Sequence, residues 1–94
     1  MFIVKINYLV DINEVEKYVK SHRDFLDIYY KQGVFLLSGP MNPRTGGIIV
    51  AKGTDRDELE EILTRDPYAL AGIAKYELIE FSAVKYCDEI SSLI

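Results

Sequence analysis

Residues 33–52 read GVFLLSGPMNPRTGGIIVAK. Two apolar runs, Val34–Ser38 and Gly47–Lys52, flank a segment that is dense in Gly, Pro and Asn. β-Branched and aromatic side chains favour strands, whereas Gly, Pro and Asn favour turns. The stretch therefore predicts a β-hairpin whose turn spans residues 39–46.

A long helix is predicted immediately before this hairpin, from Asp11 to about Gln32. Residues that can face a core recur there at three- and four-residue steps, the spacing of one helical face. They are Val15, Tyr18, Val19, His22, Phe25, Leu26 and Tyr29. Asp11 with Glu14 three residues later is typical of a capping box, and Gly33 is typical of a helix end.

A second helix, Asp57–Thr64, is predicted after the hairpin, with Thr54 or Asp55 as its N-cap. Asp66 followed by Pro67 then predicts one more helical turn, because Asp is a favoured cap and Pro suits the first helical position.

The outermost segments, Phe2–Val10 and Tyr76–Tyr86, are rich in strand-forming residues. The order of elements is therefore β-α-β-β-α-β. With right-handed crossovers this order predicts an α+β fold, the ferredoxin-like plait, as a single domain over residues 1–94. In this fold a four-stranded antiparallel sheet carries both helices on one face.

The predicted strands are apolar on both faces, which is unusual for a sheet that exposes one face to water. Leu36 lies beside Phe35 and Leu37, Ile48 beside Ile49, and Leu78 beside Ile79 and Phe81. We therefore expect a second surface to cover the open face, most simply the same sheet of another copy. The sequence predicts a homodimer.

The amino-acid composition argues against several classes of function. Fifteen acidic and eleven basic residues give a net charge of −4, and no cluster of Lys and Arg is present, which argues against binding to nucleic acid or an anionic membrane. No apolar run reaches the ~18–20 residues that cross a bilayer. The single cysteine, Cys87, cannot form an internal disulfide, which suits a reducing cytoplasm, the location we expect.

His22 is the only histidine and lies on the apolar face of the first helix. Histidine is the side chain whose ordinary pKa allows proton exchange near neutrality. Two interpretations remain open: a core histidine with a hydrogen bond, or a general acid/base oriented by a carboxylate. Asp66 is the best candidate for that carboxylate, although its position before Pro67 is fully explained by capping.

Other residues carry weaker signals. Ser38, Gly39 and Pro40 end a strand, and they either form a simple turn or line a pocket with exposed backbone and a hydroxyl. Arg44 is interpreted as a solvated turn residue, with an anionic ligand as the alternative. One histidine and one cysteine do not provide the ligands of a zinc site, and no motif indicates a flavin or nucleotide.

Three segments together resemble the YCII-related (YciI-like) family of small proteins. They are SHRDFL at 21–26, GVFLLSGP at 33–40, and DPY at 66–68 with Ala71-Gly72. The resemblance implies a ferredoxin-like fold that dimerises through its sheets into an α+β barrel. It also implies a candidate active site formed by His22 and Asp66. Some members of the family, or relatives in the wider barrel superfamily, act on small ring compounds, and these include dehydrochlorinases and muconolactone isomerases. The hairpin from Pro40 to Gly47 is short for this pattern, which predicts a shallow pocket.

Two function hypotheses follow. In the first, the protein is a cofactor-free lyase or isomerase acting on a small oxygenated ring compound. His22 moves the proton, Asp66 orients the imidazole, and Ser38, Gly39 and Pro40 line the pocket. In the second, the protein is a dimeric module that holds a small ligand or docks a partner without catalysis.

Overall fold

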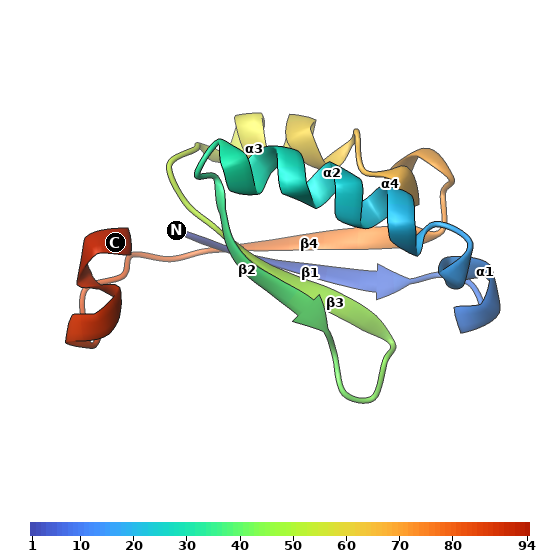
Figure 1. The fold of residues 1–94 in the computed structure, drawn as a ribbon, viewed down its shortest axis with the longest axis horizontal. Coiled ribbons are helices and arrows are strands. Elements are labelled where there is room, and N and C mark those ends of the chain that lie inside the picture. The colour runs from blue at the N-terminus through green and yellow to red at the C-terminus, as the bar shows by residue number, and fades with distance from the viewer.

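Strand β1 lies inside a four-stranded antiparallel sheet with the strand order β2-β3-β1-β4. The computed structural model describes residues 1–94, and three helices, α2, α3 and α4, cover one face of this sheet (Figure 1). The strands are β1 (Phe2–Tyr8), β2 (Phe35–Pro40), β3 (Gly46–Ala51) and β4 (Ala74–Glu80), and the helices are α1 (Ile12–Glu16), α2 (Val19–Lys31), α3 (Arg56–Leu63) and α4 (Pro67–Leu70). The predicted α+β class with a four-stranded antiparallel sheet is confirmed.

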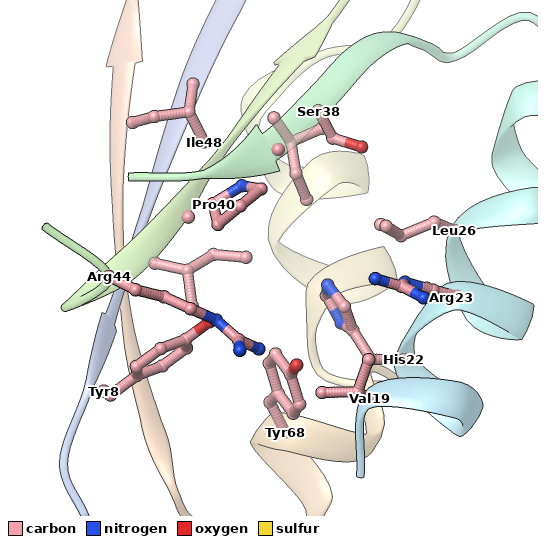
Figure 2. A pocket seen from close by; sticks show the side chains of 14 residues that line it. Tyr8, Val19, His22, Arg23, Leu26, Ser38, Pro40, Arg44, Ile48 and Tyr68 are labelled. Carbon is pink, nitrogen blue, oxygen red and sulfur yellow. The ribbon is translucent and has the colours of Figure 1, made fainter. Parts of the chain in front are cut away.

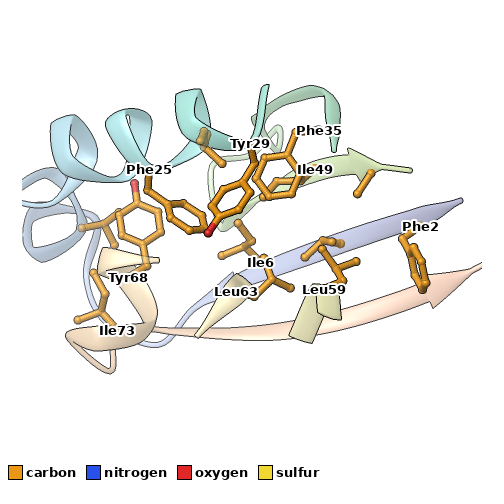
Figure 3. Packing of buried hydrophobic residues seen from close by; sticks show 14 residues of the cluster. Phe2, Ile6, Phe25, Tyr29, Phe35, Ile49, Leu59, Leu63, Tyr68 and Ile73 are labelled. Atoms are coloured by element: carbon orange, nitrogen blue, oxygen red, sulfur yellow. The ribbon is translucent and has the colours of Figure 1, made fainter. Parts of the chain in front are cut away.

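The core lies between the sheet and these helices (Figure 3). Alternate residues of β1, namely Phe2, Val4 and Ile6, are buried because successive side chains of a strand point to opposite faces. The helix α2 contributes Phe25 and Tyr29 from its apolar face. This single apolar layer holds α2 at a fixed position above the sheet, and α2 carries His22.

The prediction of one continuous helix from Asp11 to Gln32 is wrong. The chain forms the short helix α1 and then α2, and it bends at Tyr18, which has φ −113° and ψ 0°. α1 buries Val15 at the end of the sheet, whereas α2 runs across the sheet, so one straight helix cannot do both (Figure 1). Asp11 forms no side-chain cap, and Glu14 instead pairs with Lys17.

Both helix boundaries next to the hairpin agree with the boundaries predicted from the sequence. Gly33 has φ +75° and ends α2, with its own N–H donated to Tyr30 O and the Val34 N–H donated to Tyr29 O. This is the Schellman arrangement that favours glycine. At the start of α3, the Asp55 carboxylate accepts the Glu58 N–H at 2.8 Å, so Asp55 rather than Thr54 is the N-cap.

The last strand is shorter than predicted, and it ends at Glu80 instead of Tyr86. Its only partner is β1, in which Phe2 lies opposite Glu80, and the Phe81 N–H donates to Met1 O. The pairing of β4 with β1 therefore ends at the first residues of β1. The remaining residues leave the sheet and end in a 3-10 helix, η1 (Asp88–Leu93), as Figure 1 shows.

The sheet face opposite the helices is largely apolar at its centre. Directly opposed residues in an antiparallel sheet share a face, which places Ile3 with Val50 and Ile79 on this side. Leu37 and Ile79 are 60% and 50% exposed. No helix of the chain is both long enough and apolar enough to span a membrane.

Candidate active site

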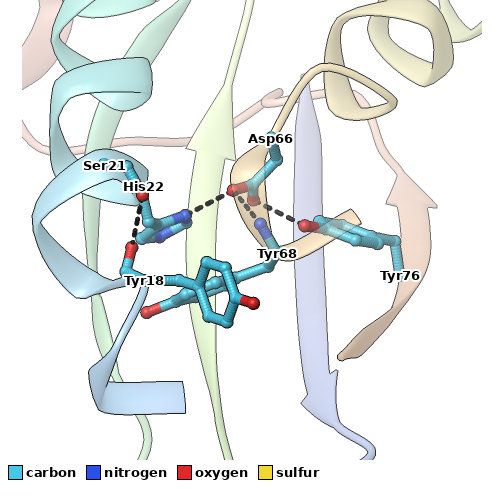
Figure 4. Close-up of polar contacts among 6 residues, drawn as sticks. All are labelled: Tyr18, Ser21, His22, Asp66, Tyr68 and Tyr76. Carbon is cyan, nitrogen blue, oxygen red and sulfur yellow. Dashed lines mark hydrogen bonds and ion pairs between the residues drawn. The ribbon is translucent and has the colours of Figure 1, made fainter. Parts of the chain in front are cut away.

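His22 reaches from α2 towards the start of α4. Its Nδ1 lies 2.8 Å from Oδ1 of Asp66, although the two residues are 44 positions apart in sequence (Figure 4). The imidazole stacks on the ring of Tyr68, with centroids 4.0 Å apart and planes 8° apart. The His22 side chain is 12% exposed, so it is held on one side by packing and still reaches solvent.

Asp66 is completely buried and serves as the N-cap of α4. Its Oδ1 accepts the Tyr68 N–H at 3.1 Å as well as the contact from His22, and its Oδ2 accepts the Tyr76 hydroxyl at 2.5 Å. The capping interpretation and the partner interpretation of Asp66 are therefore both correct. Neither excludes the other, because a carboxylate has enough acceptor sites for all three contacts.

When Asp66 is ionised, its contacts specify which nitrogen of the neutral imidazole carries the proton. An ionised carboxylate only accepts hydrogen bonds, so the Nδ1 of His22 must be the donor. In the neutral ring the lone pair then lies on Nε2, which makes no hydrogen bond to the protein. Burial, followed by the charge and hydrogen bond of Asp66, raises the pKa of Tyr76, so its hydroxyl remains a donor to this carboxylate.

A pocket of about 340 Å³ opens beside His22, between α2 and the β2–β3 hairpin (Figure 2). Ligand pockets typically occupy ~300–1,000 Å³, so this one is small. Its lining combines apolar side chains from the sheet and α2 with a few polar groups. The lining residues are Ile6, Tyr8, Val19, His22, Arg23, Leu26, Ser38, Gly39, Pro40, Arg44, Gly47, Ile48, Ile49 and Tyr68.

The residues singled out from the sequence fall in two places. Ser38, Gly39 and Pro40 line the pocket with His22, whereas Asp66 lies behind the imidazole and does not line it. The Ser38 hydroxyl lies 2.5 Å from the Tyr30 hydroxyl, a partly buried pair at the pocket wall.

Sequence reasoning missed several residues of this pocket. The sequence favours a solvated turn residue at Arg44 over one that meets an anionic ligand, yet Arg44 lines the pocket, where its guanidinium pairs with Glu16. Glu16 and then Tyr8 raise the pKa of Arg44. Burial, with smaller contributions from Tyr8 and Asp66, raises the pKa of Tyr68 to about 12. Tyr68 lies two residues after Asp66, so the expected pair of His22 and Asp66 was the signal that could have placed Tyr68 near His22.

No group of three or more His, Cys, Asp or Glu side chains gathers as metal ligands would. The chemistry that the arrangement offers is proton transfer. A free imidazole nitrogen faces a small cavity, and a buried carboxylate stabilises the ring when it accepts a proton.

Comparison with known proteins agrees with this architecture. A model of the YCII-related domain family matches residues 1–82, most of the chain. No curated protein sequence matches. Among solved structures, the chain is similar to 5-chloro-2-hydroxyhydroquinone dehydrochlorinase (TftG) from Burkholderia phenoliruptrix AC1100, in complex with 2,5-dihydroxybenzoquinone. The TM-score is 0.73 at 15% identity, over 86% of this chain and 92% of that chain, which shows a shared fold.

Proposed function

The chain belongs to the YCII-related domain family, and we propose that it is a cofactor-free lyase or isomerase that moves a proton on a small oxygenated ring compound. The observation that carries this proposal is the 2.8 Å contact between His22 Nδ1 and Asp66 Oδ1 beside an open pocket. An aspartate that only caps a helix does not require a histidine beside it. A histidine that only packs in a core does not require a cavity beside it. Their combination at one site favours catalysis.

In this mechanism Nε2 of His22 takes a proton from a carbon or oxygen of the substrate. The imidazole becomes positively charged, and Asp66 stabilises that charge through the Nδ1 hydrogen bond. In an isomerisation, Nε2 returns the proton at another position of the substrate. In an elimination, the electron pair of the broken C–H or O–H bond forms a new double bond, the leaving group departs with its bonding pair as an anion, and Nε2 then releases the proton to water. General acid/base assistance of this kind contributes typically ~10²–10⁴-fold.

The similar structure supports the reaction class. TftG is by name a dehydrochlorinase, a lyase that acts on a chlorinated hydroxyhydroquinone, and its complex holds a quinone ring. A single six-membered ring is compatible with a pocket of about 340 Å³. Apolar walls such as Leu26 and Ile49 would contact the faces of a ring, and Ser38 offers a hydroxyl to its oxygen substituents.

The proposal extends to the assembly. We propose that the sheet is a ferredoxin-like plait whose open face pairs with a second copy to form a dimeric α+β barrel. The exposed Leu37 and Ile79 support this pairing, since apolar side chains gathered on a sheet face favour a covering surface. Buried barrel residues would stiffen the strands that carry the pocket.

The test is turnover with His22→Ala and Asp66→Asn. Chloride release from 5-chloro-2-hydroxyhydroquinone is the first assay, followed by related hydroquinones and lactones. We expect each variant to lose ~10²–10⁴-fold of kcat/KM. Asp24→Asn is the matched control, because Asp24 lies on the exposed side of α2 and pairs only with Lys20. Full activity in either site variant would end the proposal.

A further inference from the structure

The charged side chains that line the pocket are all basic. The chain as a whole has 15 acidic and 11 basic residues, yet the pocket lining contains two arginines and no Asp or Glu. Figure 2 shows Arg23 and Arg44 on opposite sides of the pocket, with His22 between them in that view. Outside the pocket acidic residues outnumber basic ones, so the pocket lining is a local region of positive charge, which attracts anions.

Arg44 is held in place from the hairpin side. It lies in the turn between β2 and β3, its Nη1 donates to Glu16 Oε1, and Tyr8 lies beside it. A guanidinium has five N–H donors, and the contacts with Glu16 and Tyr8 leave others available. Arg44 therefore remains able to donate to a ligand, while Glu16 balances its charge.

Arg23 approaches from the helix side. It follows His22 on α2, lines the same pocket, and takes part in none of the ion pairs of the chain. Its neighbour Asp24 pairs with Lys20 instead. The charge of Arg23 is therefore uncompensated at the pocket.

We propose that the compound bound here carries one carboxylate, which Arg23 and Arg44 hold while its ring extends towards Nε2 of His22. The charged groups at the pocket favour a ligand with a single negative charge. Glu16 balances Arg44 and Asp66 faces His22, so among these groups only Arg23 lacks a counterion. Guanidinium groups match a carboxylate with paired N–H donors. This inference names the substrate class and rests on the proposed function for the role of the ring.

The experiment measures binding of benzoate and salicylate by ¹H–¹⁵N NMR titration, with benzamide and salicylamide as neutral counterparts of equal shape. We expect the two acids to shift signals of pocket residues at millimolar concentration and the amides to bind at least about 10-fold more weakly. Arg23→Gln should weaken benzoate binding by about 10-fold or more, and raised salt should weaken it in the wild type.

Lys20→Gln is the matched control, because it removes one positive charge from the same helix at a side chain that is 91% exposed and outside the pocket. Equal binding of acids and amides, equal effects of Arg23→Gln and Lys20→Gln, or no binding of either acid would each overturn the inference. His22→Gln distinguishes the two proposals. It should retain benzoate binding, and it abolishes turnover only if the proposed catalytic role is correct.

Discussion

At the residue scale, Tyr68 links the cap of α4 to the imidazole. Its N–H is donated to Asp66, and its ring stacks on His22 at 4.0 Å. The stack and the Asp66 contact together restrict the imidazole to one orientation. An aromatic ring here therefore positions the imidazole, independently of its hydroxyl.

Because the Tyr68 hydroxyl is buried, we expect the folded protein to lose stability at alkaline pH. Its pKa is raised from 10.0 to about 12, chiefly by burial. A group that holds its proton more tightly when folded contributes stability that is complete below its unfolded pKa. This contribution is then lost as the pH rises through the folded pKa. We expect the free energy of unfolding, measured by urea denaturation, to fall between about pH 10 and 12.

The variant Tyr68→Phe keeps the stacked ring and removes the titrating hydroxyl, so its free energy of unfolding should fall less steeply over that range. Tyr86→Phe, at an exposed position in the C-terminal segment, should behave as the wild type does. A parallel fall in Tyr68→Phe and the wild type would show that another group causes the alkaline change.

At the scale of elements, the packing of β3 against β1 depends on Gly46. A Cβ at this position would lie 1.7 Å from the carbonyl oxygen of Ile6, a main-chain atom that cannot move away without shifting β1. We expect Gly46→Ala to lower the free energy of unfolding by about 1–3 kcal/mol or more, the usual range for overpacking.

Gly39→Ala is the control for this prediction. A Cβ there meets nothing within 4 Å, and Gly39 lies on the neighbouring strand of the same hairpin. Its free energy of unfolding should change by no more than about 0.5 kcal/mol. If both alanine variants unfold at the same urea concentration, the close approach at Gly46 has no energetic role.

The elements also show how far sequence reasoning reaches. Local signals predicted the hairpin, the end of α2 at Gly33 and a cap at Thr54 or Asp55, because turn and cap preferences depend on neighbouring residues. The bend at Tyr18 and the end of β4 at Glu80 depend on tertiary structure. The bend at Tyr18 follows from where α1 meets the sheet, and the end of β4 follows from where β1 begins.

The same distinction applies to the site. His22 and Asp66 could be selected from their residue types, their positions and the family resemblance. For Arg44 the sequence offered a ligand contact only as the less favoured alternative, because only the folded hairpin brings it beside the pocket that His22 lines. The contact of Tyr76 with Asp66 likewise depends on β4 lying next to β1, a pairing of distant segments.

At the scale of the whole molecule, the two faces of the sheet have different roles. One face supports the helices and the pocket, and the other exposes Leu37 and Ile79. If two copies pair through this second face, size-exclusion chromatography with light scattering should give twice the chain mass. Ile79→Lys should then give a monomer, because a charge on the shared face would be buried without a partner.

Ile28→Lys provides the comparison for that experiment. Ile28 is 52% exposed, as Ile79 is 50% exposed, but it lies on α2 in the helical layer. It should leave the measured mass unchanged. A monomeric wild type, or equal loss of the dimer in both variants, would contradict pairing through the open face of the sheet.

The pairing of His22 with Asp66 is tested most directly by ¹⁵N NMR of the His22 ring, in the wild type and in Asp66→Asn. The Nδ1 contact with Asp66 predicts that the neutral form of the wild-type ring carries its proton on Nδ1. Removing the carboxylate should give a mixture of tautomers, and Asp24→Asn should leave the ring unchanged. A wild-type ring that carries its proton on Nε2, or the same spectrum in Asp66→Asn, would contradict this pairing.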